Sequence, residues 1–178
     1  MSTIVQRLSW ADERGRCLRY GKFANRSAVR MLVRTMLGLA SPVAAVRGEG
    51  AVQVNRLDHL VLTVASIEAT AEFYARVLGM DVVTFGAGRT ALAFGTSKIN
   101  LHQAGREFEP KALHPTPGSA DICLIVDDDV TDVIPQLAAA GVPVEVGPVE
   151  RTGATGTIIS CYLRDPDHNL IELSNYLP

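Results

Sequence analysis

One short sequence pattern occurs twice in this chain of 178 residues. The first copy, LDHLVLTV, begins at Leu57, and the second, SADICLIV, begins at Ser119. A shift of 62 positions places His59 on Asp121 and aligns the glycines at positions 79 and 141. A fixed repeat distance indicates repeated structural units. The pattern therefore predicts two similar modules, with a polar residue at the same point of each.

Each copy is followed by the same predicted order of elements. Alternating apolar residues predict a strand at 56–64, and Ser66 and Gly79 are suited to begin and end a helix over 66–78. Further strands of the first copy are expected at 80–85, 90–95 and 98–102. The second copy predicts a strand at 121–126, a helix at about 130–140, and strands near 144, at 158–163 and at 170–174. The predicted fold is α+β, with two tandem βαβββ modules that form a curved mixed sheet around a cavity.

A glycine-rich break at 48–50 divides the chain into two expected regions. Residues 1–53 form a basic N-terminal extension, and residues 54–178 form the domain, with modules at about 54–105 and 118–176. The first 50 residues carry a formal charge of +6, so the remainder carries −8. Domains that bind nucleic acid usually present a basic surface. We therefore expect no nucleic acid partner for the domain.

The extension is open to several interpretations. Chain termini are often disordered or loosely docked, but arginine-rich termini also resemble mitochondrial leaders. A start at Met31 would make the segment that follows it resemble a short secretory signal. The three cysteines, at 17, 123 and 161, form no CxxC pair, which favours a reducing compartment. No apolar run reaches the length of a membrane span. We expect a cytoplasmic protein, with mitochondrial localisation as the alternative.

Strand alternation predicts which polar side chains share a face. In four of the predicted strands, apolar residues point one way and one residue able to bind a metal points the other way. These residues are His59, His102, Asp121 and Glu172. We treat His102 and Glu172 as counterparts, because each lies opposite an Ile-x-Leu pair in the strand that closes its module. If the two faces meet around a cavity, all four side chains converge there.

Two imidazoles and two carboxylates suit a divalent metal such as Zn, Ni, Co, Mn or Fe(II). Such a metal would leave coordination positions open for substrate oxygens, and Glu172 could also move a proton as a catalytic base. Each of the four residues also has a purely structural interpretation, at a strand start, in a turn or on a solvated strand. Asp121 is short enough to lie behind the ligands rather than among them.

The glycine-rich stretch at 151–156 has two interpretations. It predicts either a mobile loop in which Arg151 binds an anionic group of the substrate, or a plain hairpin connection. Both alternatives place a turn between two strands of the second module.

Three motifs together resemble the vicinal oxygen chelate superfamily, which includes glyoxalases, bleomycin-resistance proteins and extradiol dioxygenases. They are LDHLVLTV from Leu57, FYARVLGM from Phe73 and RDPDHNLIE from Arg164, and the resemblance covers about residues 54–176. Within the superfamily, the sequence of the linker between the two modules resembles glyoxalase domain-containing protein 5 and its bacterial relatives labelled virulence proteins. The resemblance implies paired βαβββ modules around a divalent metal. It implies that His59 and Glu172 are metal ligands, and that His102 is a ligand because of its position. Asp121 occupies a position where many members of the superfamily have histidine.

The resemblance implies a glyoxalase-like, metal-dependent lyase or isomerase. Its small-molecule substrate would chelate the metal through vicinal oxygens. The alternatives are an Fe(II) extradiol-type dioxygenase and a non-catalytic, small-molecule-binding protein of the resistance type. Analogy with the family also leads us to expect a homodimer, and leaves open whether modules pair within one chain or between two.

Overall fold

The computed structural model of the chain describes residue 50 and residues 52–178. The predictions made for the N-terminal extension, including a targeting leader, fall almost entirely outside these residues. Contacts between Cα atoms group residues 51–178 into one compact unit. In the described part, no helix has both the length and the apolar character that crossing a membrane requires.

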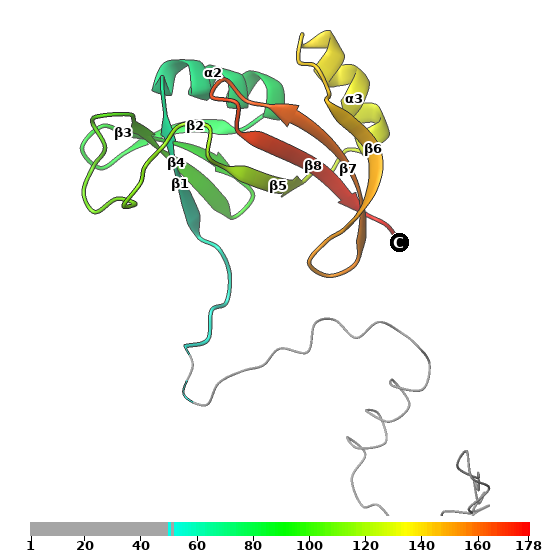
Figure 1. The fold of residues 1–178 in the computed structure, drawn as a ribbon, viewed down its shortest axis with the longest axis horizontal. Coiled ribbons are helices and arrows are strands. Elements are labelled where there is room, and N and C mark those ends of the chain that lie inside the picture. Colours follow the sequence, from blue (N-terminus) through cyan, green and yellow to red (C-terminus); the bar gives the residue numbers. More distant parts are fainter. Residues whose placement is uncertain (1–49, 51) are drawn as a thin grey trace, which may run out of the picture. The chain divides into compact units, whose positions relative to one another are not determined.

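Two modules follow one another along the chain (Figure 1). The first contains β1 (His59–Val64), α2 (Ile67–Leu78), β2 (Asp81–Phe85), β3 (Arg89–Phe94) and β4 (Ser97–Gln103). The second contains β5 (Asp121–Ile125), α3 (Val130–Ala139), β6 (Val146–Thr152), β7 (Thr157–Arg164) and β8 (Leu170–Tyr176). The predicted α+β class and the two βαβββ modules are confirmed.

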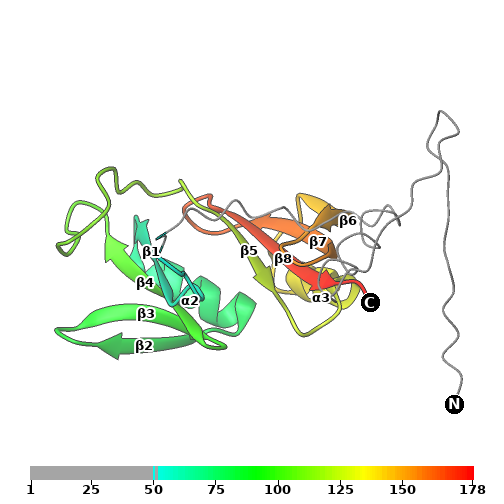
Figure 2. The same cartoon turned by 90° about the horizontal axis from the view of Figure 1, so that it is seen from below.

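Each module builds its own four-stranded mixed sheet, as the view from below also shows (Figure 2). The strand orders are β1-β4-β3-β2 and β5-β8-β7-β6, so the two modules have the same topology. In both, the first strand pairs in parallel with the last, and the other pairs are antiparallel. The repeated first strands, β1 and β5, are therefore edge strands of their sheets.

Local sequence signals define both helices. The Ser66 hydroxyl accepts a hydrogen bond from the Ala69 backbone N–H at 3.2 Å, which satisfies one of the free donors of the first turn of α2. Gly79 ends this helix with a φ of 64°, a conformation that costs glycine little. Both ends of α2 are as predicted. In α3 the cap is Asp129, whose carboxylate accepts from the Thr131 N–H at 2.8 Å, and the sequence analysis had not singled out this residue.

The core lies between the sheets and their helices, and strand alternation places it there. The even-numbered residues of β1 and the odd-numbered residues of β4 and β8 face the core. The buried residues of these strands are Leu62, Val64, Ile99, Leu101, Ile171 and Leu173. The predicted apolar faces are therefore confirmed, and the opposite face of each sheet is left for polar side chains.

A buried carboxylate in the turn between β7 and β8 connects the two modules. Asp165 is 4% exposed, and its Oδ2 accepts from the Tyr74 hydroxyl at 3.0 Å and from the Asn169 side-chain amide at 2.8 Å. Its Oδ1 accepts from the backbone N–H groups of Asp167 and Asn169. Tyr74 belongs to α2 of the first module, so this hydrogen bond crosses between the modules. Burial and the nearby Asp165 carboxylate raise the pKa of the Tyr74 phenol above its usual range.

Two further hydrogen bonds from the same turn reach beyond it. The Asp167 carboxylate accepts from the Ala65 backbone N–H at 3.1 Å, at the entrance to α2. The Asn169 side-chain oxygen accepts from the Ala120 N–H at 2.8 Å, immediately before β5. The turn thus holds the start of α2 and the start of β5 in place together.

Replacing Tyr74 with phenylalanine removes the donor that crosses between the modules and leaves the ring in place. A buried acceptor that loses one partner typically costs about 1 to 3 kcal/mol, so we expect the free energy of unfolding to fall by that amount. Urea unfolding followed by circular dichroism measures it. The control is Tyr176→Phe at an exposed position, where we expect a change within about 0.5 kcal/mol. Equal losses in both variants would contradict the assigned role of Tyr74.

Candidate metal and substrate site

The four residues predicted as metal ligands belong to different sheets. His59 and His102 lie on β1 and β4 of the first module, and Asp121 and Glu172 lie on β5 and β8 of the second. Within residues 52–178, no three side chains of His, Cys, Asp or Glu come together closely enough to hold a metal ion. A single chain therefore supplies the four residues on two separate faces and does not gather them at one point.

Strand register corrects the predicted pairing of His102 with Glu172. In the first module Val61 is paired with Asn100, and in the second, Cys123 is paired with Glu172. Val61 and Cys123 are equivalent under the 62-residue shift, so the counterpart of Glu172 is Asn100. The sequence contained this signal, because Asn100 and Glu172 each stand between an isoleucine and a leucine. His102 lies one step further along the same face of β4.

His59 is held by its sequence neighbour. Its Nδ1 is 3.0 Å from a carboxylate oxygen of Asp58, whose other oxygen accepts from Arg56 at 3.2 Å. The hydrogen bond with His59 and the charge of Arg56 lower the pKa of Asp58. An ionised carboxylate can only accept, so Nδ1 carries the hydrogen, and neutral His59 has its lone pair on Nε2. The His59 side chain is 46% exposed, which leaves Nε2 available to a ligand.

His102 is buried beneath the linker between the modules. It is 6% exposed, and its ring packs edge-on against Phe108 with centroids 5.6 Å apart. It also lines a pocket of about 330 Å³ with Val61 and Thr63 and with linker residues 110–112. The Nδ1 of His102 and the Oδ1 of Asn100 are buried and have no hydrogen-bond partner among the described residues. Buried polar atoms are rarely left unpaired, so this face of β4 is chemically unsatisfied.

Glu172 lies in a cluster of hydroxyl and thiol groups that sequence reasoning missed. It is paired with Tyr162 across β7 and β8, and with Cys123 across β5 and β8. The Ser174 hydroxyl donates to Glu172 Oε1 at 3.4 Å and lies 2.9 Å from the Ser160 hydroxyl. Partial burial acts to raise the pKa of Glu172, but hydrogen bonds from these four side chains outweigh it, so the pKa lies below its usual value. The cluster favours an ionised carboxylate.

Arg151 lies inside β6, and residues 153–156 form the turn to β7. The stretch therefore connects β6 and β7 as a hairpin, and the binding of an anionic group by Arg151 stays a prediction. The Arg151 Nε donates to the Tyr162 hydroxyl at 3.2 Å, and its guanidinium Cζ is 5.6 Å from the centre of that ring. Arg151 thus contacts the residue that pairs with Glu172.

Asp121 is exposed and lines a pocket of about 380 Å³ between the edge strands β1 and β5. Val61 and Thr63 line the same pocket from β1, and His114 and neighbouring linker residues close it. Asp121 lies two residues before Cys123 on β5, so its side chain points to the same side of the sheet. It remains a predicted ligand or a residue that supports one.

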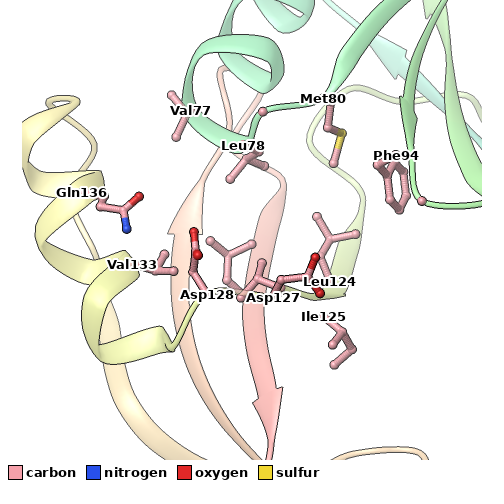
Figure 3. A pocket seen from close by; sticks show the side chains of 14 residues that line it. Val77, Leu78, Met80, Phe94, Leu124, Ile125, Asp127, Asp128, Val133 and Gln136 are labelled. Carbon is pink, nitrogen blue, oxygen red and sulfur yellow. The ribbon is translucent and has the colours of Figure 1, made fainter.

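A larger cavity lies away from all the predicted site residues (Figure 3). It has a volume of about 550 Å³ and lies between the end of α2, the β3–β4 turn, β5 and α3. Its wall combines apolar side chains, among them Met80, Phe94 and Leu124, with polar groups that include Asp127 and Asp128. In the described structure, no group of three or more side chains able to hold a metal ion converges there.

Comparison with known sequences identifies the family. Residues 56–173 match the family described as Glyoxalase/Bleomycin resistance protein/Dioxygenase superfamily. The chain belongs to this superfamily. Membership agrees with the observed βαβββ topology and confirms the resemblance seen in the sequence motifs.

Individual relatives support a narrower group. Virulence protein STM3117 of Salmonella typhimurium is 57% identical over 124 residues, which are 70% of this chain and 86% of that protein. Its crystal structure matches with a TM-score of 0.70 at 56% identity, covering 71% of this chain and all of that one. Glyoxalase domain-containing protein RDO1 of Mycosarcoma maydis is 55% identical over 130 residues, 73% of each chain. Biphenyl-2,3-diol 1,2-dioxygenase 2 of Rhodococcus globerulus is 32% identical over 124 residues, 66% of this chain and 61% of that one.

Replacing Tyr162 with phenylalanine should raise the pKa of Glu172, because a hydrogen bond to the charged form is lost. A carboxyl group with a lowered pKa stabilises the fold above the ordinary glutamate pKa, and this contribution is lost as the pH falls through the folded-state value. The variant should therefore lose stability mainly above that range. Carbon-13 NMR titration of the Glu172 side-chain carboxyl measures the pKa directly, with Tyr176→Phe as the control. An unchanged Glu172 pKa in the Tyr162 variant would show that this hydrogen bond is not what lowers it.

Proposed function

We propose that this protein is a glyoxalase-type, metal-dependent lyase or isomerase whose small-molecule substrate binds the metal through two adjacent oxygens. The observation that carries the proposal is the environment of Glu172. A carboxylate kept ionised by hydroxyl donors, on a sheet face turned away from the core, is equipped to bind a metal and to accept a proton. Membership of the superfamily supports this proposal.

The donor atoms present fit a divalent metal. His59 would bind through Nε2, which the Asp58 contact leaves free, and Glu172 would bind through its carboxylate. The unpartnered atoms of Asn100 and His102 supply further nitrogen and oxygen donors on the face that also carries His59. Asp121 offers a further carboxylate on the face of Glu172. Mixed nitrogen and oxygen donors suit Zn, Ni, Co, Mn and Fe(II) alike.

Each residue then has a distinct task. The metal, when bound, would supply Lewis acidity towards a carbonyl or enediolate oxygen. Glu172 accepts a proton from the substrate carbon next to that oxygen and can return it to the neighbouring position. Tyr162 keeps the Glu172 carboxylate oriented and in turn accepts a hydrogen bond from Arg151. Arg151 supplies a positive charge for an anionic group of the substrate.

The site would be completed by a second copy of the chain. His59 and Glu172 lie on separate sheets of one chain, and the described residues do not bring the predicted ligands together. In a two-fold symmetric homodimer, the first module of one chain can face the second module of its partner, so that two equal sites form. The edge strands β1 and β5 are the natural contact, since each has one side without a strand partner.

Metal content tests the ligand assignment. Purified protein should hold about one equivalent of divalent metal per chain, and His59→Ala, His102→Ala and Glu172→Ala should each lose most of it. His168→Asn is the matched control, because His168 is an exposed residue of the turn between β7 and β8. Elemental analysis by mass spectrometry provides the readout. Full metal content in all three variants would refute the proposal.

Mixing two inactive variants tests where the site is formed. Dimers of His59→Ala with Glu172→Ala contain one site with both changes and one intact site if modules pair between chains. Random subunit exchange should then restore about one quarter of the sites. Metal content and activity should recover together after mixing and should stay absent in each variant alone. No recovery, with subunit exchange verified by mass spectrometry, would show that each site forms within one chain.

An Fe(II)-dependent dioxygenase is the second candidate, and the similarity to a biphenyl-diol dioxygenase favours it. Oxygen consumption separates the two candidates, because an isomerase or lyase consumes none. The protein is first reconstituted with ferrous iron under anaerobic conditions, and catechols are then added in air. If it is the proposed isomerase, it should consume no oxygen. Stoichiometric uptake with ring cleavage would replace the proposal with the dioxygenase.

A further inference from the structure

Two cationic side chains of the first module lie against one aromatic ring. The Arg89 guanidinium Cζ is 5.0 Å from the centre of the Phe85 ring, and the Lys98 Nζ is 3.9 Å from the same centre. Both residues are half-buried. Arg89 also lies 5.7 Å from the ring centre of Phe108 in the linker. Both positive charges thus lie against the ring of Phe85.

Neither cation has a protein counter-ion. In the described part of the chain, no carboxylate lies within 4.0 Å of Arg89 or Lys98, and neither side chain donates a hydrogen bond. Asp81 is on the same side of the sheet, aligned with Lys98 through Ala93 on the strand between them, and still forms no ion pair with it. A guanidinium has five N–H donors and an ammonium three, and contact with a ring face leaves the guanidinium edge free. Two neighbouring like charges without a counter-ion attract an anion.

Arg89 also borders a pocket, which Lys98 does not line. The pocket has a volume of about 320 Å³ and is also lined by Arg106, Phe108 and Thr90. Arg106 is exposed and has no carboxylate partner among the described residues. A guanidinium, a second guanidinium and a hydroxyl therefore border the same space.

Polar atoms without a hydrogen-bond partner lie on β4, on the same face as Lys98. Lys98, Asn100 and His102 alternate along this strand and share one face. His102 is 94% buried with an unpartnered Nδ1, and the Asn100 Oδ1 beside it is also buried and unpartnered. Phe108 contacts both the His102 ring and the Arg89 guanidinium. Phe108 therefore lies between the Arg89 guanidinium and the buried His102 ring.

We propose that Arg89 and Lys98 form an anion-binding site on this face, which takes a carboxylate or phosphate group of the substrate. The planar guanidinium of Arg89 binds two oxygens of the anion side by side, and the Lys98 ammonium makes a third contact with the anion as a point charge. This inference rests on the proposed function, because it names the substrate class as a small anion with adjacent chelating oxygens.

Binding of simple anions to metal-free protein tests the site. Full-length protein treated with EDTA is titrated with inorganic phosphate and, separately, with acetate, and the arginine side-chain N–H signals are followed by NMR. We expect saturable shifts of the Arg89 signal with at least one anion. Loss of a charged hydrogen bond costs about 1.5 to 3 kcal/mol, so Arg89→Gln and Lys98→Gln should each weaken binding roughly tenfold to hundredfold. For Arg89→Gln the shifts are read from backbone amides of β3 and β4.

The matched control is Arg164→Gln, which removes one positive charge from an exposed ion pair with Glu145 in the second module. It should leave the anion affinity unchanged within about twofold, since distant exposed charges are screened by salt. Unchanged affinity in Arg89→Gln, or an equal loss in the control, would overturn the proposal, as would the absence of saturable binding of both probes. Thermal unfolding of each variant verifies that it is folded. Preference for phosphate over acetate, or the reverse, identifies which group of the substrate is bound.

The test is independent of the metal site. Because the titration uses protein without metal, anion binding can be found even if metal content shows that the proposed ligands are wrong. Conversely, a stoichiometric metal site in a protein that fails to bind either anion would remove the anion site and leave the metal proposal standing.

Discussion

The buried carboxylate of Asp165 is the constraint on which the arrangement of both modules depends. It accepts four hydrogen bonds, from the Tyr74 hydroxyl, the Asn169 amide and two backbone N–H groups. Because a buried carboxylate is costly unless its oxygens are satisfied, the turn before β8 and helix α2 must stay together. This contact fixes the first module, through its helix, to the strand that carries Glu172. The turn and α2 therefore position the polar faces of the sheets from the opposite, buried side.

The repeat preserves geometry and changes chemistry. Each module buries one face of its sheet and leaves the other face for polar residues. On the first module this face carries two cations over an aromatic ring, with Asn100 and His102. On the second module, the position equivalent to Asn100 holds Glu172, which lies among hydroxyl groups. The polar faces of the two modules therefore differ in charge, with a positive surface on the first and an ionised carboxylate on the second.

Local features were predictable from the sequence, and long-range ones were not. Ser66, Gly79 and the alternating residues of β1 and β4 act through neighbours within a few positions, so the helix ends and the buried faces followed from the residue pattern. The pairing of Asn100 with Val61 depends on register between strands almost forty residues apart. A single shift of 62 aligns the first strands, but the closing strands differ by 72, because the chain between them is longer in the second module. The ring of Phe108 over His102 arises from a proline-rich linker without periodicity, which gives no pattern to read.

The unequal chemistry of the two faces has a consequence for how such a protein can change over time. Substitutions around Phe85 and Arg89 alter what the first module attracts, without contact to the carboxylate on the second. Substitutions around Tyr162 and Ser174 alter proton affinity without affecting the cationic surface. The cationic pair and the ionised carboxylate thus lie on different modules, which hydrogen bonds of the turn before β8 hold together. A new ligand preference can be acquired in one half while the other half is conserved.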